Sequence, residues 1–91
     1  MSDSLNPNAS PLDHESIQVA LEVDASGLAC PLPILRAKKA LAQIESGQTI
    51  KVLTTDQHAL TDFQAFAQQT GNRLLKQVQQ GEVLVHYLCR R

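Results

Sequence analysis

The spacing of apolar residues along this 91-residue chain changes from that of a strand to that of a helix, and it does so twice. From residue 17 to 23, apolar residues alternate with polar or small ones, the pattern of a half-buried strand. Beyond Pro33, the apolar residues Ile34, Ala37, Leu41 and Ile44 recur at helical spacing. We therefore expect a strand followed by a helix, with Gly47 at the helix C-cap position.

The second half of the chain repeats this order and then adds a hairpin. Residues 49–55 are rich in β-branched side chains, which favours a short buried strand. A second helix is predicted over about 60–70, with Leu60, Phe63, Phe66 and Ala67 on its apolar face and Gly71-Asn72 at its end. Two further strands are predicted, at 74–78 and at 83–89, joined by a turn at Gln80-Gly81.

The predicted order strand, helix, strand, helix, strand, strand indicates a two-layer α/β sandwich. With a right-handed crossover in the first unit and a hairpin at the end, the simplest packing is a mixed four-stranded sheet with both helices on one face. The order of the strands in the sheet stays open. Residues 1–16 are polar and bear two prolines, so we expect a flexible tail there and one domain over 17–91.

The composition gives no support to a secreted, a membrane-bound or a nucleic-acid-binding protein. Neither a signal peptide nor a stretch of about 20 apolar residues is present, so we expect a cytoplasmic protein without membrane contact. The formal net charge of −1 and the low aromatic content make direct nucleic-acid binding an unfavoured interpretation. In a reducing compartment, the two cysteines Cys30 and Cys89 are not expected to form a structural disulfide.

The turn Cys30-Pro31-Leu32-Pro33 is the candidate reactive site of the chain. A proline disfavours helical backbone in the residue before it, so Cys30 and Leu32 are expected to be extended and the helix to begin at or near Pro33. The amides of a first helical turn lack helical partners and favour a nearby negative sulfur. We therefore predict an exposed, reactive Cys30 thiol with a lowered pKa.

Two interpretations of Cys30 are open on these grounds. Free cysteine is among the most buried residue types, so Cys30 could be a small apolar side chain in a turn. Two stiffening prolines at a helix start favour a presented nucleophile instead. Arg36 and Lys39, with Lys38 between them, would add positive potential and could dock an acidic partner.

The residues Asp24, Gly27, Cys30, Pro31 and Pro33 form the pattern Asp-x-x-Gly-x-x-Cys-Pro-x-Pro. In this pattern, and from about residue 19 to the end, the chain resembles the TusA/SirA family of small sulfur-transfer proteins. The resemblance implies a two-layer α/β sandwich without a cofactor, in which Cys30 is the catalytic residue and the other four residues support it.

The resemblance also implies a function as a sulfurtransferase-type carrier rather than an ordinary turnover enzyme. Cys30 would receive sulfane sulfur as a persulfide from a cysteine desulfurase or a rhodanese and pass it to an acceptor protein. The acceptor pathway could be tRNA thiolation, sulfur oxidation or cofactor biosynthesis. Leu32 stands where some members carry Glu, and Asp56 is followed by Gln57-His58 where the tRNA-thiolating type has Asp-Pro.

The remaining candidates have weaker signals. Cys89 alternates with Val83, Val85 and Tyr87, which predicts a structural thiol on the core face or edge of the sheet, with a resolving cysteine for Cys30 as the alternative. His58 could serve Cys30 as a proton partner. No histidine or cysteine spacing predicts a metal site. The alternative function is a thiol-based redox-regulatory or interaction module that transfers no sulfur.

Overall fold

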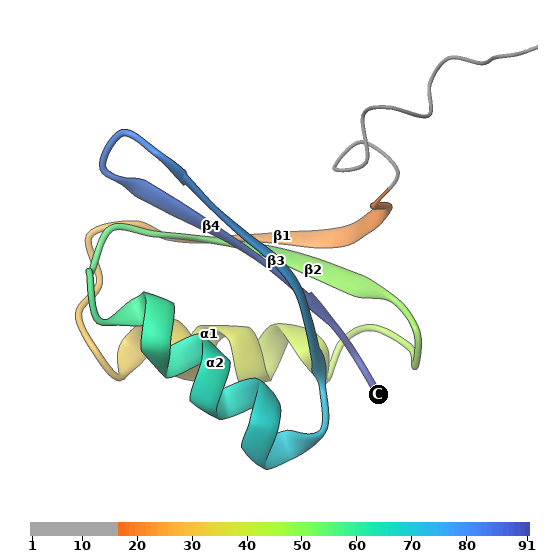
Figure 1. Cartoon of the computed structure of the whole chain (residues 1–91). Helices are drawn as coiled ribbons and strands as arrows, with labels where there is room; N and C mark the ends of the chain where they lie inside the picture. Colours follow the sequence, from red (N-terminus) through yellow and green to blue (C-terminus); the bar gives the residue numbers. More distant parts are fainter. Residues whose placement is uncertain (1–16) are drawn as a thin grey trace, which may run out of the picture.

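The structure of the chain, a computed structural model, describes residues 17–91 (Figure 1). The tail predicted for residues 1–16 lies outside the described residues. The elements are β1 (Val19–Ala25), α1 (Leu32–Leu41), β2 (Thr49–Thr54), α2 (Ala59–Thr70), β3 (Arg73–Gln80) and β4 (Val83–Cys89). Both the type and the order of all six elements are as predicted from the sequence.

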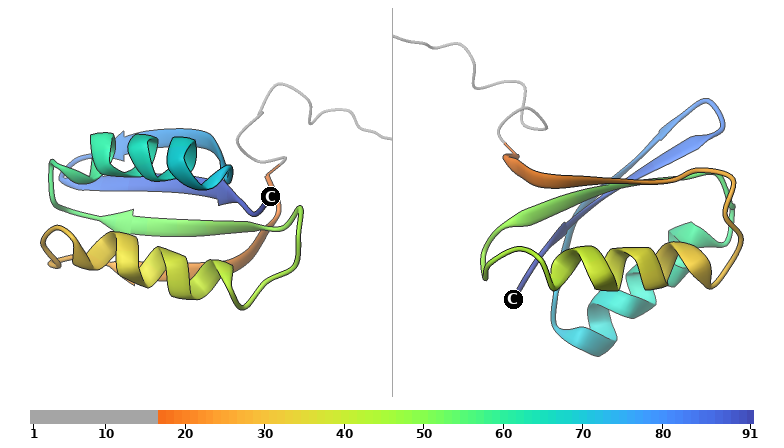
Figure 2. Two further views of the ribbon diagram at one scale, coloured as in Figure 1. Left: turned by 90° about the horizontal axis from the view of Figure 1, so that it is seen from below. Right: turned by 180° about the vertical axis from the view of Figure 1, so that it is seen from behind.

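The four strands form one sheet in the order β1-β2-β4-β3. β1 pairs parallel to β2, and the pairs β2–β4 and β4–β3 are antiparallel. The two helices lie side by side on one face of this sheet (Figure 2). The predicted two-layer sandwich with a mixed sheet is confirmed, and the structure supplies the strand order, which the sequence had left open.

The first helix begins earlier and ends earlier than predicted. Leu32 is helical rather than extended, because its N–H donates to the Ala29 carbonyl at 2.9 Å and the Leu35 N–H donates to the Pro31 carbonyl at 3.2 Å. These two bonds close the first turn and override the extended preference of a residue that precedes proline. The helix ends with Ala42 at the C-cap, not with Gly47, which forms the later turn into β2.

The second helix ends as the sequence predicts. Gly71 has a φ of 83°, the left-handed conformation that glycine adopts without strain, and its N–H donates to the Ala67 carbonyl. The predicted apolar face is correct except at its start, where Ala59 is buried and Leu60 is 39% exposed. The helix therefore rests on the sheet through Ala59, Phe63, Phe66 and Ala67.

The inner strand β4 presents the opposite face to the one expected. His86 is opposite Val52 and Leu88 is opposite Ile50, and side chains directly opposite each other share a face of the sheet. Ile50 and Val52 belong to the core beneath the helices, so His86 and Leu88 also point toward the helices. Cys89 was predicted as a structural thiol on the core face or edge of the sheet. It is buried, as a structural thiol would be, but it lies on the face away from the helices, at the last residue of an inner strand.

A register shift divides the alternating residues of β3 between the two faces. Leu74 is opposite Leu88, whereas Lys76 is opposite Tyr87, so the shift falls at Leu75. An extra residue in one strand of a pair reverses the facing of every residue beyond it. Gln77 consequently faces the helices and is opposite His86.

Candidate functional site

The turn that leads from β1 to Cys30 is held by Asp24 and Gly27. The Asp24 carboxylate accepts a hydrogen bond from the Ser26 N–H at 3.0 Å, and hydrogen bonds from the Ser26 hydroxyl and amide lower the pKa of Asp24. Gly27 has a φ of 80°, and its N–H donates to Thr55 Oγ1 at 2.8 Å. The two residues of the sequence pattern thus shape the turn and connect it to the end of β2.

The backbone of Cys30 is fixed by a residue from the loop between β2 and α2. Its N–H donates to Asp56 Oδ2 at 2.9 Å, while Asp56 Oδ1 accepts the His58 N–H at 3.0 Å and lies 3.1 Å from His58 Nδ1. The backbone bonds from His58 and Cys30 lower the pKa of Asp56. Asp56 therefore joins the start of α2 to the Cys30 turn, and the imidazole of His58 contacts Asp56.

The side chain of Cys30 is exposed and lies beside Asp62, in the first turn of α2. The pKa of the Cys30 thiol is raised above its ordinary value, first by the hydrogen bond of the thiol with the Asp62 carboxylate. Partial desolvation and the charges of Asp62 and Asp56 act in the same direction. The prediction of a lowered thiol pKa is wrong, because two carboxylates distant in sequence lie beside the sulfur.

The start of α1 also offers fewer backbone donors to a negative sulfur than expected. Pro31 and Pro33 carry no N–H, and the N–H groups of Leu32 and Leu35 are already bonded to carbonyls. The prolines that favour a helix start thus remove part of the anion site that a helix start usually provides.

A shallow groove of about 240 Å³ runs from Cys30 between the two helices. Its lining residues are Cys30, Pro31, Ile34, Asp62, Ala65, Phe66 and Gln69. Three large apolar side chains of the same two helix starts are exposed, namely Leu32, Leu35 and Leu60. The surroundings of the thiol are therefore largely apolar, apart from the carboxylates of Asp62 and Asp56.

The two basic residues expected to help docking do not line this groove. Arg36 and Lys39 are exposed, but successive helical residues are about 100° apart. The side of α1 toward α2 carries Ile34, which lines this groove, and Lys38, which lines a second hollow beside it. Arg36 and Lys39 therefore lie on the other side of α1. Their predicted role in docking stays a prediction.

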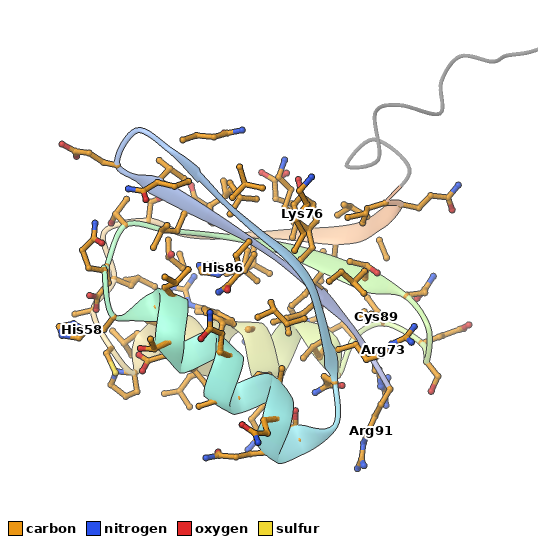
Figure 3. The ribbon with its side chains drawn as sticks, viewed as in Figure 1. His58, Arg73, Lys76, His86, Cys89 and Arg91 are labelled. Carbon is orange, nitrogen blue, oxygen red and sulfur yellow. The ribbon has the colours of Figure 1, made fainter. Side chains whose placement is uncertain are left out.

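The second cysteine lies at the far end of the sheet from the first. Cys89 is opposite Thr49, the first residue of β2, whereas the Cys30 amide is bound by Asp56, beyond the last residue of β2. The length of β2 alone separates these points by about 17 Å, and a disulfide needs Cα atoms within about 7 Å. Figure 3 shows Cys89 and His58 at opposite ends of the molecule. A resolving role for Cys89 within one chain is thus excluded.

A buried polar network, which was not predicted, lies under α2. His86 is fully buried and stacks on Phe63 with ring centroids 4.4 Å apart. Gln77 Nε2 lies 3.0 Å from His86 Nδ1, and His86 Nε2 lies 2.8 Å from Thr54 Oγ1. An amide nitrogen only donates, so Nδ1 accepts and Nε2 carries the proton. Burial lowers the pKa of His86 to about 4.

Asp62 is the site residue that the sequence interpretation missed. The sequence does place Asp62 in the first turn of a predicted helix. Carboxylates are common at that position because they interact favourably with the helix dipole, so the position alone did not indicate a functional residue. Within residues 17–91, no group of three or more metal-binding side chains gathers. Over the same residues, none of the helices is long and apolar enough to cross a membrane.

Comparison with known proteins identifies relatives over most of the chain. The family model described as sulfurtransferase TusA matches residues 21–90. The sulfur carrier protein TusA of Allochromatium vinosum is 51% identical over 70 residues, covering 77% of this chain and 91% of that protein. A putative sulfur carrier protein of Neisseria meningitidis serogroup A is 56% identical over 61 residues, covering 67% and 82%.

A solved structure shares the fold as well. The crystal structure of a SirA-like protein from Desulfitobacterium hafniense superposes with a TM-score of 0.68 at 30% identity, covering 76% of this chain and 95% of that one. Sequence and structure thus lead to the same group of small proteins.

Proposed function

Because this chain belongs to the TusA sulfurtransferase family, we propose that it carries sulfane sulfur as a persulfide on Cys30 and relays it to an acceptor protein. The observation that carries this proposal is the exposed Cys30 thiol in an apolar groove that the Asp62 carboxylate also lines. An exposed sulfur can be reached by a cysteine of another protein, whereas a shallow groove leaves little room for a small substrate.

Loading requires that the Cys30 sulfur attack the outer sulfur of a donor persulfide. The thiol proton passes to Asp62, the sulfur–sulfur bond of the donor breaks, and the donor thiolate leaves and takes up the proton. The products are the Cys30 persulfide and a donor thiol, with no net oxidation. We suggest a cysteine desulfurase or a rhodanese as the donor, since both carry sulfur as a protein persulfide.

Discharge follows the same course in the opposite direction. A cysteine thiolate of the acceptor attacks the outer sulfur on Cys30, and Cys30 leaves as a thiolate that is reprotonated through Asp62. A thiol with a raised pKa is mostly protonated at neutral pH, so the free Cys30 thiol resists stray oxidants after discharge and before the next loading. In this proposal Asp24, Gly27, Pro31 and Pro33 hold the turn that presents the sulfur.

The proposed function belongs to a reducing compartment such as the cytoplasm, where both cysteines would stay free. The acceptor pathway, whether tRNA thiolation, sulfur oxidation or cofactor biosynthesis, would be chosen by protein docking around Cys30. Capture of partners by a mixed disulfide on Cys30 identifies that pathway.

The test is mass spectrometry after incubation with a persulfide-loaded cysteine desulfurase. We expect the protein to gain the mass of one sulfur atom, Cys30→Ala to gain none, and the matched variant Cys89→Ala to load normally. Sulfur retained by Cys30→Ala, or absence of loading in the unmodified chain with several donors, would refute the proposal.

A further inference from the structure

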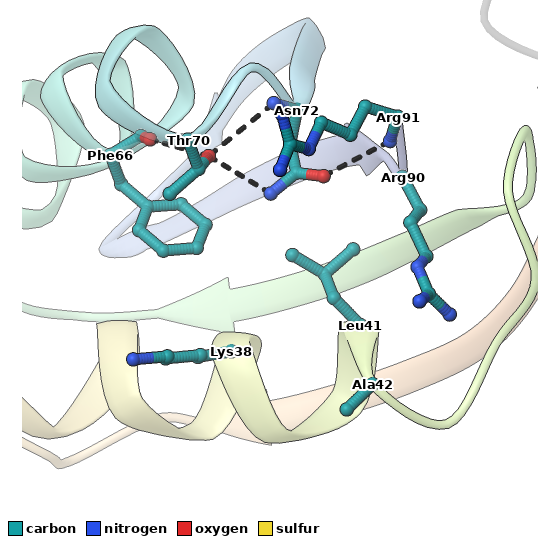
Figure 4. A pocket seen from close by; sticks show the side chains of 8 residues that line it. All are labelled: Lys38, Leu41, Ala42, Phe66, Thr70, Asn72, Arg90 and Arg91. Carbon is teal, nitrogen blue, oxygen red and sulfur yellow. Dashed lines mark hydrogen bonds between the residues drawn. The ribbon is translucent and has the colours of Figure 1, made fainter.

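A second hollow with the opposite charge lies beside the groove at Cys30. This hollow has a volume of about 290 Å³ and lies between the C-terminal halves of the two helices and the end of β4 (Figure 4). Both hollows are lined by Phe66, so they meet at this side chain. We call these two neighbouring hollows along α1 and α2, taken together, the interhelical groove.

The end of the interhelical groove that is remote from Cys30 is basic. Its lining residues include Lys38, Arg90 and Arg91, with Leu41, Ala42 and Phe66 as the apolar part. Ion pairs among the described residues are Lys51–Glu22 and His58–Asp56, so none of the carboxylates in residues 17–91 neutralises these three cations.

Two of the three cations face solvent. The Arg90 guanidinium donates to the Ile44 carbonyl, behind the end of α1. Lys38 and Arg91 are exposed, and the Arg91 side chain lies against Gly71, while its N–H donates to Asn72 Oδ1 at 3.0 Å. Lys38 and Arg91 are therefore placed to meet a negative group that enters the groove.

We propose that the interhelical groove binds an extended segment of the partner protein that exchanges sulfur with Cys30, with the partner's cysteine at Cys30 and an acidic side chain at Lys38 and Arg91. This inference rests on the proposed function and adds the chemistry of the partner. Charge complementarity selects the occupant, because the groove is apolar in the middle, basic at one end and bears Asp62 beside the sulfur at the other.

The dimensions set the spacing within that segment. Lys38 and Leu41 follow the first residue of α1 by six and nine residues, which is about 9 and 14 Å at the helical rise. An extended chain covers the same distance with about three to five residues. The acidic side chain of the partner should then lie about three to five residues from its reactive cysteine.

The experiment measures thiol–disulfide exchange with synthetic peptides on the full chain. Cys30 is first converted to a mixed disulfide with a chromogenic nitrothiobenzoate, and each peptide thiol releases the dye as it forms a disulfide with Cys30. One hexapeptide bears a cysteine, three small apolar residues and two glutamates, and a second has two lysines in place of the glutamates. A third has the glutamates next to the cysteine.

At low ionic strength, we expect the peptide with distant glutamates to react about three- to tenfold faster than either of the others, as two exposed ion pairs allow. Salt should remove the difference. Lys38→Gln with Arg91→Gln should also abolish it, whereas Arg36→Gln with Lys39→Gln removes the same charge from the other side of α1 and should not. An RNA oligonucleotide at the peptide concentration should leave the preference in place.

Equal rates for the three peptides would overturn the inference. So would a preference that depends on Arg36 and Lys39, or one that RNA abolishes. Because dye release needs only a Cys30 disulfide, this result is independent of sulfur loading. A chain that shows the peptide preference but takes up no sulfur would refute the proposed function alone. A chain that takes up sulfur but shows no peptide preference would refute only the proposed binding of a partner segment in the groove.

Discussion

Protonation of His86 should destabilise the fold as the pH falls from about 6.5 to about 4. His86 is fully buried, and its Nδ1 faces the amide of Gln77, which donates to it. A proton on Nδ1 would place a positive charge in the core, and the Nδ1–H and the Gln77 amide N–H would then be two donors facing each other without an acceptor. The ordinary pKa of histidine near 6.5 is thereby lowered to about 4 in the folded state.

The sign and the size follow from linkage. Between pH 6.5 and 4 the unfolded chain binds a proton at this histidine and the folded chain does not, so the free energy of unfolding falls as the pH falls. A shift of about 2.5 pKa units at about 1.36 kcal/mol each predicts a loss of about 3 kcal/mol across this range. The full stability is present above pH 6.5.

Denaturant unfolding followed by far-ultraviolet circular dichroism, at several pH values from 7.5 to 4, measures this loss. The variant His86→Gln should be less stable at neutral pH and should show little pH dependence over the same range. The matched variant His58→Gln, which changes an exposed histidine, should keep the slope of the unmodified chain. A flat profile for the unmodified chain, or an equal slope in His86→Gln, would refute the assignment.

Three further predictions concern the site and the fold. Asp62→Asn should lower the pH midpoint of Cys30 ionisation, measured by thiolate absorbance, because it removes the main cause of the raised pKa. The control variant Asp24→Asn should leave this midpoint unchanged. An unchanged midpoint in Asp62→Asn would contradict the assignment of Asp62 to the site. Cys89→Ala should lower the stability without changing the rate at which Cys30 is alkylated, since the two sites are at opposite ends of β2. Gly71→Ala should cost about 1–2 kcal/mol in thermal unfolding, because φ there is 83°, and no loss would show that the turn relaxes.

The amino-acid sequence by itself determined the elements and the position of the thiol. Hydrophobic period is a local property, so it identified both helices, all four strands and the two-layer architecture. The turn Cys30-Pro31-Leu32-Pro33 was likewise recognisable, because prolines act on their immediate neighbours. The ends of the elements were predicted less accurately. Gly47 was predicted as the C-cap of the first helix, but this helix ends at Leu41, and Gly47 belongs to the turn before β2.

Only the tertiary structure decided what surrounds the sulfur and which way the inner strands face. Alternation along β4 is satisfied by either face, and the pairing with β2 turned His86 rather than Cys89 toward the helices. Asp56 and Asp62 reach Cys30 from 26 and 32 residues away in the chain. The hydrogen bond with Asp62, and then the charges of both carboxylates, raise the pKa of a thiol for which the local sequence predicted a lowered one. Electrostatic interactions depend on distance in space, and the sequence specifies that distance only through the fold.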